Sequence, residues 1–418
     1  MDIDKLLQLE SRKCFNYLME TTNYDENSKG YGLTQDRFKQ PKMCSLAASG
    51  FAIASLAIGV ENKWISYKLG KERALNTLKN IYENIDHYGG MLLHFVNKDT
   101  GIRHGKSEFS TIDTALFIAG MLVVDSYFSD DVIRKYANLI YNRIDWNRYI
   151  FEHDGKTQFY MSYNNLVKGS YRNKSKSPWI YHWSMTAEQL IMYILAAGSQ
   201  KVSKDTAKAL FNGFDRPIAH YRNIEYVHSP ENGLFTYQYS HIFFPFQNYL
   251  DSNNFDWFLN SQKAHEAHVL YAKNHRKHNP TFRGGIFGLS ASDTPKGYRG
   301  DGFSLYNDLG KKTLPRHKPT GTVAIYSMLC GLPFVEKAVK KGVVSLYENY
   351  PDAFTERGFV DAINFKNDNH WIDDDYLGID KGATLLMIDN YYSGTVWKMI
   401  EKHSIIQNGI RKLDFIRK

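Results

Sequence analysis

The chain has 418 residues, of which 43% are hydrophobic and 23% charged, and its 52 Lys and Arg against 44 Asp and Glu give a formal net charge of +8. This balance, without any low-complexity tract, excludes a disordered chain, and the length allows two or three domains or one large barrel. Basic residues cluster only at 172–176 and 273–277, and no zinc finger or RNP-like strand is present, so nucleic-acid binding is not expected.

From the N-terminus onward, nearly all-apolar segments alternate with amphipathic ones. The apolar segments predict helices buried on every side, and they are 45–60, 111–124, 187–198, 322–330 and 383–388. The amphipathic segments predict helices with one exposed face, and they are 65–85, 131–144, 203–214, 335–347 and 396–405, with 257–271 as a further candidate. The uncharged stretch 43–60 is just long enough to cross a membrane, but its Ser, Gly and Ala content favours a buried helix, so no membrane insertion is expected.

This alternation, repeated five or six times, predicts an all-α protein in which an outer ring of helices surrounds an inner ring, an (α/α) barrel. Strand-like pieces at 92–97, 158–163 and 235–239 are expected to be hairpin excursions in loops, and 279–302 and 310–321 to be long loops. Because nothing resembles an interdomain linker, residues 1–418 are predicted to form a single domain.

Two compositional features bear on partners and location. Aromatic residues make up 15% of the chain, and Tyr and Trp suit the binding of sugars, nucleobases or large partners. The three cysteines are far apart in the sequence and form no CxxC pair, which indicates a reducing compartment. The first residues do not resemble a signal peptide, so a cytoplasmic location is expected, or a periplasmic or secreted one if a leader has been removed.

Polar and acidic residues gather where the predicted buried helices begin. In chain order they are Asp36, Arg37, Glu108, Asp113, Trp183, Glu188 and Asp380. Because the inner helices of a double ring start at the same end, these side chains are expected to meet at one mouth, lined also by aromatics such as Tyr239 and Tyr298. Helix capping explains many such residues. Asp113 and Glu188, however, interrupt apolar runs, where a carboxylate is costly unless it is paired or functional.

Eleven segments spread over nearly the whole chain follow one another in the order of a known family. They include GLTQDR (32–37), SLAASGFAIASLAIGVENKWIS (45–66), EFSTIDTALFIAGML (108–122), AEQLIMYILAAGS (187–199), FGLSASDTPKGY (287–298), TGTVAIY (320–326) and GIDKG–IDNYYSGTVW (378–397). In these segments the chain resembles the glucoamylase-like family of bacterial (α/α)6-barrel proteins to which the endo-β-1,2-glucanases belong. The resemblance implies a glycoside hydrolase acting on a β-linked glucan, endo-acting on β-1,2-glucan or a related bacterial polysaccharide, with no cofactor.

The resemblance also implies two catalytic residues. The glutamate of the family's buried helix falls on Glu188, and the aspartate of its STIDTAL segment falls on Asp113. Glycosidic cleavage needs an acid to protonate the leaving oxygen and a second carboxylate as nucleophile or base. Apolar surroundings and a neighbouring negative charge would keep Glu188 protonated as the acid. For the second role Asp113 is preferred over Glu108, Asp380 and Asp389, and inversion is the default expectation from the family.

Further residues are predicted to bind substrate. The set is Asp36, Arg37, Glu108, Trp183, Tyr239, Asp293, Tyr298, Asp380 and Asp389. For the loop residues, anchoring of loops is an alternative, as is an ion pair between Asp36 and Arg37; for Trp183 the alternative to stacking on a sugar is packing in the core. The family pattern DGTVAP reads TGTVAI here, and IENYRSG reads IDNYYSG, which places Asp389 and Tyr392 at changed positions. These departures predict altered subsites at the mouth.

Other functions stay open at this point. His265 and His268 have a helical spacing used in metal sites, but without HExxH or a third ligand no metal is predicted. A polysaccharide lyase or transglycosylase on the same barrel is one alternative, and a lyase would need a Tyr or His base with Arg or Lys neutralising a uronate. A carbohydrate-binding protein that has lost catalysis is another. The expected partner in every case is an oligo- or polysaccharide, and the oligomeric state is not predicted.

Overall fold

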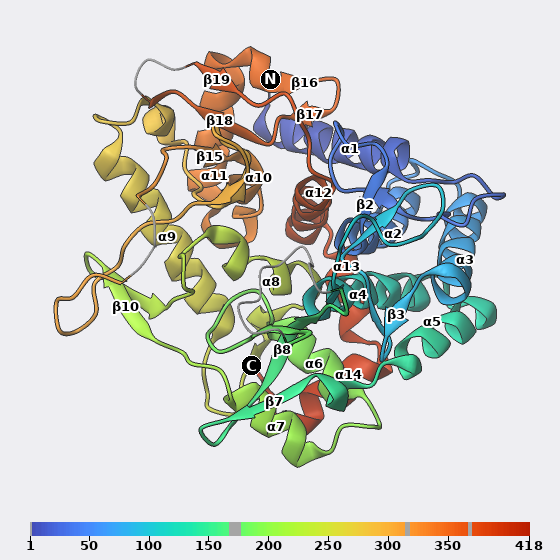
Figure 1. Cartoon of the computed structure of the whole chain (residues 1–418). Coiled ribbons are helices and arrows are strands. Elements are labelled where there is room, and N and C mark those ends of the chain that lie inside the picture. The colour runs from blue at the N-terminus through green and yellow to red at the C-terminus, as the bar shows by residue number, and fades with distance from the viewer. Residues whose placement is uncertain (1, 167–176, 314–317, 367–369) are drawn as a thin grey trace.

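The structure is a computed structural model that describes residues 2–166, 177–313, 318–366 and 370–418. Its helices form two rings, one inside the other (Figure 1). The inner ring consists of α2 (Leu46–Glu61), α4 (Thr111–Phe128), α6 (Leu190–Gly198), α8 (Tyr239–Phe243), α10 (Ile325–Leu329) and α12 (Gly378–Tyr392). The outer ring consists of α1 (Ile3–Thr21), α3 (Tyr67–Asn84), α5 (Asp131–Arg143), α7 (Lys204–Asn212), α9 (Trp257–His275) and α11 (Leu332–Asn349). The predicted (α/α)6 barrel is confirmed.

The two kinds of helix follow from their sequence patterns. In α2 every residue from Leu46 to Gly59 is buried, because the helix is surrounded by neighbours on all sides. In α5 the buried residues Ile133, Ala137, Ile140 and Tyr141 form a single stripe, and most of the remaining residues are polar or charged. Apolar side chains of both rings join one continuous core that runs from Leu6 to Leu413.

Two glycines, Gly50 on α2 and Gly120 on α4, allow these two inner helices to cross at very short distance. A Cβ atom on Gly120 would collide with the carbonyl oxygen of Gly50, and one on Gly50 would meet the backbone of Phe117 at 2.6 Å. The absence of side chains at both positions therefore lets the two helix backbones touch.

Some boundaries differ from the sequence predictions. The segment 396–405 is two helices, α13 (Thr395–Glu401) and α14 (Ser404–Lys412), because His403 caps the second helix by accepting from the N–H of Ile405 at 3.2 Å. The predicted strand at 235–239 is instead a 3-10 turn (Leu234–Tyr237) followed by the start of α8. The outer helix α1, which the sequence analysis did not predict, packs against α12. The helix α13 packs against α2, α4 and α8 and closes the ring at the end where α12 stops.

Short strands accompany the starts of the inner helices. They are β1 (Thr34–Gln35), β2 (Met43–Ser45), β3 (His87–Tyr88), β4 (Met91–Leu92), β5 (Phe95–Asn97), β6 (Phe109–Ser110), β7 (Ile150–His153), β8 (Lys156–Tyr163), β9 (Trp179–His182), β10 (Ile218–Tyr221), β11 (Ile224–Val227), β12 (Tyr249–Leu250), β13 (Ala291–Ser292), β14 (Arg299–Gly300), β15 (Val323–Ala324), β16 (Phe354–Thr355), β17 (Gly358–Phe359), β18 (Ala362–Asn364), β19 (Trp371–Ile372) and β20 (Ile416–Arg417). All pairs between them are antiparallel, and the largest sheet has the order β6-β8-β7 with β9 also on β8. Strands β2, β6 and β15 run directly into α2, α4 and α10, which fixes where these helices begin.

The apolar length of α4 would suffice to cross a membrane, alone among the helices of the described ranges. Because 83% of this helix is buried within the protein, its composition is explained by its place in the inner ring. The uncharged stretch at 43–60 forms β2 and the buried helix α2, as its small residues predict.

Candidate active site at the start of the inner helices

A cavity of about 440 Å³ lies where α4 and α6 begin. Of the residues predicted from the sequence, five line it: Glu108, Asp113, Trp183, Glu188 and Tyr298. Its wall also contains Tyr181, another of the aromatic residues near the predicted mouth, and His94, Glu231, Phe235 and Asp301, which the sequence analysis did not select as site residues. The expected meeting of acidic and aromatic side chains at the start of the inner helices is therefore present for these two helices.

Glu188 lies just before α6, in a bend, and not within the helix that the apolar run 187–198 predicts. The hydroxyl of Ser240 on α8 donates to the backbone carbonyl of Glu188 at 2.5 Å and so fixes this bend. Burial raises the pKa of the Glu188 carboxyl to about 7, and the negative charge of Asp113 contributes in the same direction. The side chain is therefore a carboxylic acid that keeps its proton near neutral pH.

Asp113 lies in the first turn of α4, where two side chains hold its carboxylate. The hydroxyl of Ser110 donates to Oδ2 at 2.5 Å, and Nε2 of His94 lies 3.5 Å from Oδ1. The same Ser110 side chain accepts from the N–H of Asp113 as the cap of α4. One capping serine therefore both starts the helix and orients the carboxylate.

His94 connects Asp113 with Glu108. Its Nδ1 is 2.8 Å from Oε1 of Glu108, and its ring stacks on Phe95 with 3.7 Å between centroids. Burial alone would lower the pKa of His94, but the charges of Asp113 and Glu108, the hydrogen bond to Glu108 and the charge of Asp36 together raise it to about 9. The group is thus an imidazolium between carboxylates. No spacing motif marks His94, which lies in the short connection between β4 and β5, so the sequence offers no signal for it.

Arg37 joins three chain segments beside the cavity. Its Nη1 lies 2.9 Å from Oδ2 of Asp293 and 3.3 Å from Oδ2 of Asp375, and its Nε lies 3.9 Å from Oδ2 of Asp36. The guanidinium also lies 5.8 Å from the ring centroid of Tyr298. These contacts indicate that Arg37 and Asp293 hold loops together. The expected ion pair of Arg37 with Asp36 is present, but its N–O distance is the longest of the three ion pairs. Burial raises the pKa of Asp36, although the charges of His94 and Arg37 oppose this.

Asp380 and Tyr239 lie behind the cavity wall. The Tyr239 hydroxyl donates to Oδ1 of Asp380 at 3.1 Å, and its ring contacts that of the lining residue Phe235 with 5.5 Å between centroids. Asp380 adjoins Asp361, a residue that the sequence analysis missed. Burial raises the pKa of Asp361 to about 6 and, together with the charge of Asp361, raises that of Asp380 well above its ordinary value. Two buried carboxyl groups this close share a proton more readily than both ionise.

The prediction that Asp389 and Tyr392 lie at the mouth is wrong. Asp389 lies near the opposite end of α12, where its two oxygens accept from the N–H of Thr395 at 2.9 Å and from the Thr395 hydroxyl at 3.0 Å. Tyr392 donates to Asp4 of α1 at 2.5 Å. Both residues therefore join helices at the closed end of the barrel. The other departure, at Thr320, does lie beside the cavity, because the N–H of Thr320 donates to the lining residue Asp301 at 2.8 Å.

Trp183 combines the two roles weighed for it. Its indole N–H donates to the Thr111 hydroxyl at 3.1 Å, which fixes the ring in the core, while part of its surface lines the cavity.

His265 and His268 are core histidines: His265 Nε2 lies 2.8 Å from Gln238 Nε2, and His268 Nε2 donates to the carbonyl of Asn232 at 2.9 Å. Within the described ranges, no group of His, Cys, Asp and Glu side chains is arranged to hold a metal ion.

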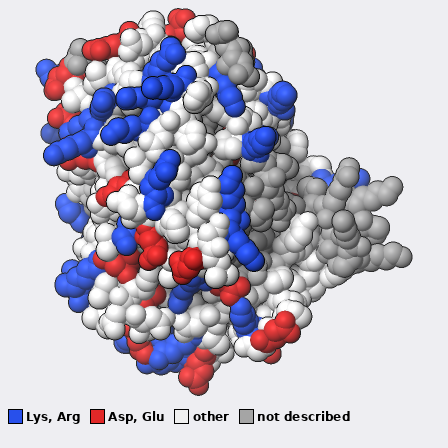
Figure 2. Space-filling model, turned by 90° about the vertical axis from the view of Figure 1, so that its left-hand side faces the viewer, with Lys and Arg blue, Asp and Glu red and all other residues white. Residues whose placement is uncertain are grey.

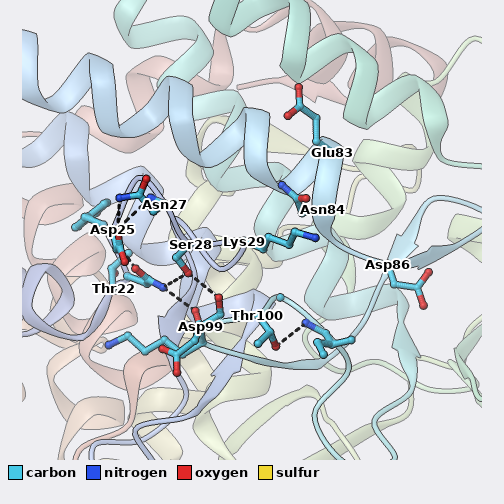
Figure 3. Close-up of a pocket in the computed structure, with 15 residues that line it drawn as sticks. Thr22, Asp25, Asn27, Ser28, Lys29, Glu83, Asn84, Asp86, Asp99 and Thr100 are labelled. Atoms are coloured by element: carbon cyan, nitrogen blue, oxygen red, sulfur yellow. Dashed lines mark hydrogen bonds between the residues drawn. The ribbon is translucent and has the colours of Figure 1, made fainter.

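A larger hollow lies elsewhere on the surface, between residues 22–29, the end of α3 and residues 97–102 (Figure 3). Its acidic side chains do not face one another. Asp25 accepts from the N–H of Asn27 in its own loop, and the Asp86 side chain points away from Asp25. Asp99 pairs with Lys42 at the surface. Without two facing carboxyl groups this hollow is no candidate for glycosidic cleavage, although its volume of about 1000 Å³ is the larger one.

The chain is similar to several known proteins over most or all of its length. The model of the Glycoamylase family, described as "Putative glucoamylase", matches residues 180–404. An exo-β-1,2-glucooligosaccharide sophorohydrolase (non-reducing end) of Parabacteroides distasonis is 23% identical over all of this chain, which spans 59% of that relative's length. The endo-β-1,2-glucanase of Chitinophaga pinensis, solved with sophorotriose and glucose, superposes with a TM-score of 0.83 at 21% identity, covering 100% of this chain and 99% of that one. A β-1,2-glucanase from Parabacteroides distasonis has a TM-score of 0.83 at 21% identity, covering 99% of this chain and 60% of that one. At these identities the structural matches show the fold.

Proposed function

From the premise that the chain belongs to the Glycoamylase family, we propose that it is a glycoside hydrolase that cleaves a β-linked glucan. The observation that carries the proposal is a pair of carboxyl groups on one cavity in different surroundings: burial raises the pKa of Glu188 to about 7, whereas Asp113 is held by a hydroxyl and an imidazolium. Acid and base catalysis of glycosidic cleavage needs one protonated and one ionised carboxyl group. The relatives named above are a β-1,2-glucooligosaccharide sophorohydrolase and an endo-β-1,2-glucanase, so a glucan with β-1,2 linkages is the first substrate to test.

In the proposed reaction Glu188 protonates the oxygen of the leaving sugar as the bond between this oxygen and the anomeric carbon breaks. Asp113 accepts a proton from a water molecule, whose oxygen forms the new bond to the anomeric carbon on the opposite face. The product is then released with inverted configuration. After one turnover Glu188 is ionised and Asp113 protonated, and exchange with solvent restores both.

The neighbours of these two groups support this division of roles. His94 contacts Oδ1 of Asp113 and the hydroxyl of Ser110 donates to Oδ2, which holds this carboxyl group in one orientation. The charge of Asp113 in turn favours the protonated form of Glu188. Trp183, Tyr181 and Phe235 supply aromatic surface to the cavity, which suits the apolar faces of sugar rings.

The composition of the cavity argues against a lyase acting on uronates. A lyase needs Arg or Lys to neutralise the uronate carboxylate, and none of the described residues that line the cavity is Arg or Lys. The imidazole of His94 is also occupied between Glu108 and Asp113. A non-catalytic binding protein becomes less attractive as well, since Asp389 and Tyr392, two of the departures that suggested it, lie away from the cavity.

A test uses purified protein with a panel of β-1,2-, β-1,3- and charged bacterial polysaccharides. We expect new reducing ends from β-1,2-glucan, loss of about 10³-fold in kcat for Glu188→Gln, and little change for Glu266→Gln, which alters a glutamate on the outer helix α9. Proton NMR of the first products reports their anomeric configuration. Full activity of Glu188→Gln would refute the assigned acid, and binding of glucan without any product would refute the hydrolase.

A further inference from the structure

A third hollow lies on the outer surface of the barrel, between the end of α9, the hairpin β10–β11 and the segments around 303–306 and 318–319. Its volume is about 670 Å³. None of its described lining residues is Asp or Glu, whereas Arg222, Lys312 and Lys318 bring permanent positive charges to it from three separate segments. No ion pair among the described residues involves any of these three cations, so their charges are not neutralised by a neighbouring carboxylate.

The wall of this pocket is held in place by ring stacking. Tyr271 lies between Phe303, at 4.2 Å between centroids, and His275, at 4.0 Å. Because both faces of Tyr271 are covered by other rings, this ladder stiffens the wall and leaves no open Tyr271 face on which a nucleobase could stack. What these residues offer to a ligand is their edges, the phenol hydroxyl and the imidazole nitrogens, which bind hydroxyl groups and anions.

The loop that carries Lys312 is also fixed. The backbone of Tyr306 pairs with His220 of β10 through two hydrogen bonds of 2.8 and 2.9 Å, and Tyr306 bridges to Lys312 on its other side. The Lys312 ammonium lies 6.0 Å from the ring centroid of Tyr306. The cationic groups are therefore presented by a preformed backbone, which lowers the entropic cost of binding.

The surroundings add to the positive potential. Three exposed basic side chains lie at the end of α9, close in sequence to the lining residue His275. They are Lys273, Arg276 and Lys277. Figure 2 shows the face of the molecule that carries α9, where Lys and Arg side chains gather most densely on the upper part. A concave site within such a field concentrates anions.

We propose that this pocket binds an anionic saccharide, a sugar that carries a phosphate group, separately from the cavity of Glu188. Three unpaired cations match the charge of a phosphate, which Arg and Lys bind through charge-assisted hydrogen bonds. The phenol and imidazole groups of the wall match sugar hydroxyls. The proposal does not rest on the hydrolase function, because no residue of the pocket lines the cavity and binding can be measured without turnover.

The test is a calorimetric titration of the full chain, carrying Glu188→Gln to prevent turnover, with glucose 6-phosphate, glucose and inorganic phosphate at low salt. We expect glucose 6-phosphate to bind at least tenfold more tightly than either glucose or inorganic phosphate. The double variant Arg222→Glu/Lys312→Glu should weaken this binding at least tenfold. The matched control Lys277→Glu, which reverses an exposed cation on the same face outside the pocket, should change it less than twofold.

Three results would overturn the proposal. Equal binding of inorganic phosphate and glucose 6-phosphate would mean that no sugar is recognised. An equal loss in Lys277→Glu would mean that the diffuse positive field, and not the pocket, attracts the ligand. Displacement of glucose 6-phosphate by a single-stranded oligonucleotide at lower concentration would identify a nucleic-acid site. Hydrolysis of glucan by Arg222→Glu/Lys312→Glu, with the natural Glu188 in place, tests the proposed function independently and is expected to be unchanged.

Discussion

The two ends of α12 carry aspartates in contrasting surroundings. Asp389, at the closed end of the barrel, has both oxygens hydrogen-bonded by Thr395. Asp380, in the first turn, has one oxygen bonded by Tyr239, while its Oδ2 is buried and has no hydrogen-bond partner among the described residues. A carboxylate that is fully hydrogen-bonded joins helices, whereas buried carboxyl groups with incomplete bonding indicate a functional region. Catalysis is therefore expected at the end of the barrel where the inner helices start.

The sharpest test of this contrast compares the same substitution at the two ends. Asp113→Asn should lower kcat by about 10²- to 10³-fold, because the amide cannot accept a proton from water. Asp389→Asn should leave kcat within about threefold. Release of reducing ends from β-1,2-glucan measures both variants. Comparable losses in the two would remove the distinction between the ends.

The burial of Glu188 should affect stability in a pH-dependent way. Its pKa in the folded protein, about 7, is above the ordinary value of 4.5, so the folded state binds the extra proton between these values and stability falls as pH rises through this window. Glu188→Gln removes the charge and should gain on the order of 2 kcal/mol at pH 8 and little at pH 4. Urea unfolding at both pH values gives the two differences. A gain of the same size at pH 4 would mean that ionisation is not its cause.

His94 should influence the reaction through the carboxylates that it contacts. In His94→Gln the positive charge between Glu108 and Asp113 is lost, so the carboxyl groups that it contacts are held less well and kcat/KM should fall. Because the charges of Asp113 and Glu108 raise the pKa of His94 to about 9, the imidazolium is present below this pH, and we expect a loss of about tenfold at pH 7 that shrinks as the pH rises through 9. A loss of the same size on both sides of pH 9 would indicate a purely structural role for this histidine.

The smallest effect concerns the closed end. Asp389→Asn keeps one acceptor for Thr395 but weakens the link between α12 and α13, so it should lower the free energy of unfolding by about 0.5 to 1 kcal/mol. Burial raises the pKa of Asp389 to about 6 despite the Thr395 hydrogen bonds, so the loss should be smaller above pH 6, where the ionised aspartate is itself disfavoured. Thermal unfolding at pH 5 and pH 8 measures the difference.

The double ring could be predicted because its evidence is local. An inner helix is apolar on all sides and an outer helix on one, and both patterns are visible within a single segment. Glu188 and Asp113 could be selected for the same reason, since each interrupts an apolar run. The exact setting of Glu188 could not: the run 187–198 predicts a helix from its first residue, but the structure begins α6 at Leu190.

His94 and Asp361 lie in short connections between helices, where no periodicity marks them. Their position beside Asp113 and Asp380 depends on which connections meet at the start of the inner ring, and this is a long-range property. Asp389 was misplaced because its position at the mouth was taken from the family pattern IENYRSG, although it follows the apolar run 383–388 and Asp380 precedes that run. The helix extends from Gly378 to Tyr392, so Asp380 and Asp389 are about 13 Å apart along its axis.

The touching backbones of α2 and α4 at Gly50 and Gly120 restrict how this barrel can evolve or be redesigned. Any larger residue at either position would force the two helices apart and shift the whole of α4, including Asp113 some two turns away. New specificity is therefore accessible through the connecting segments, which can change in length and sequence without moving this joint. An engineer who wishes to enlarge the substrate range should vary those segments and leave both glycines untouched.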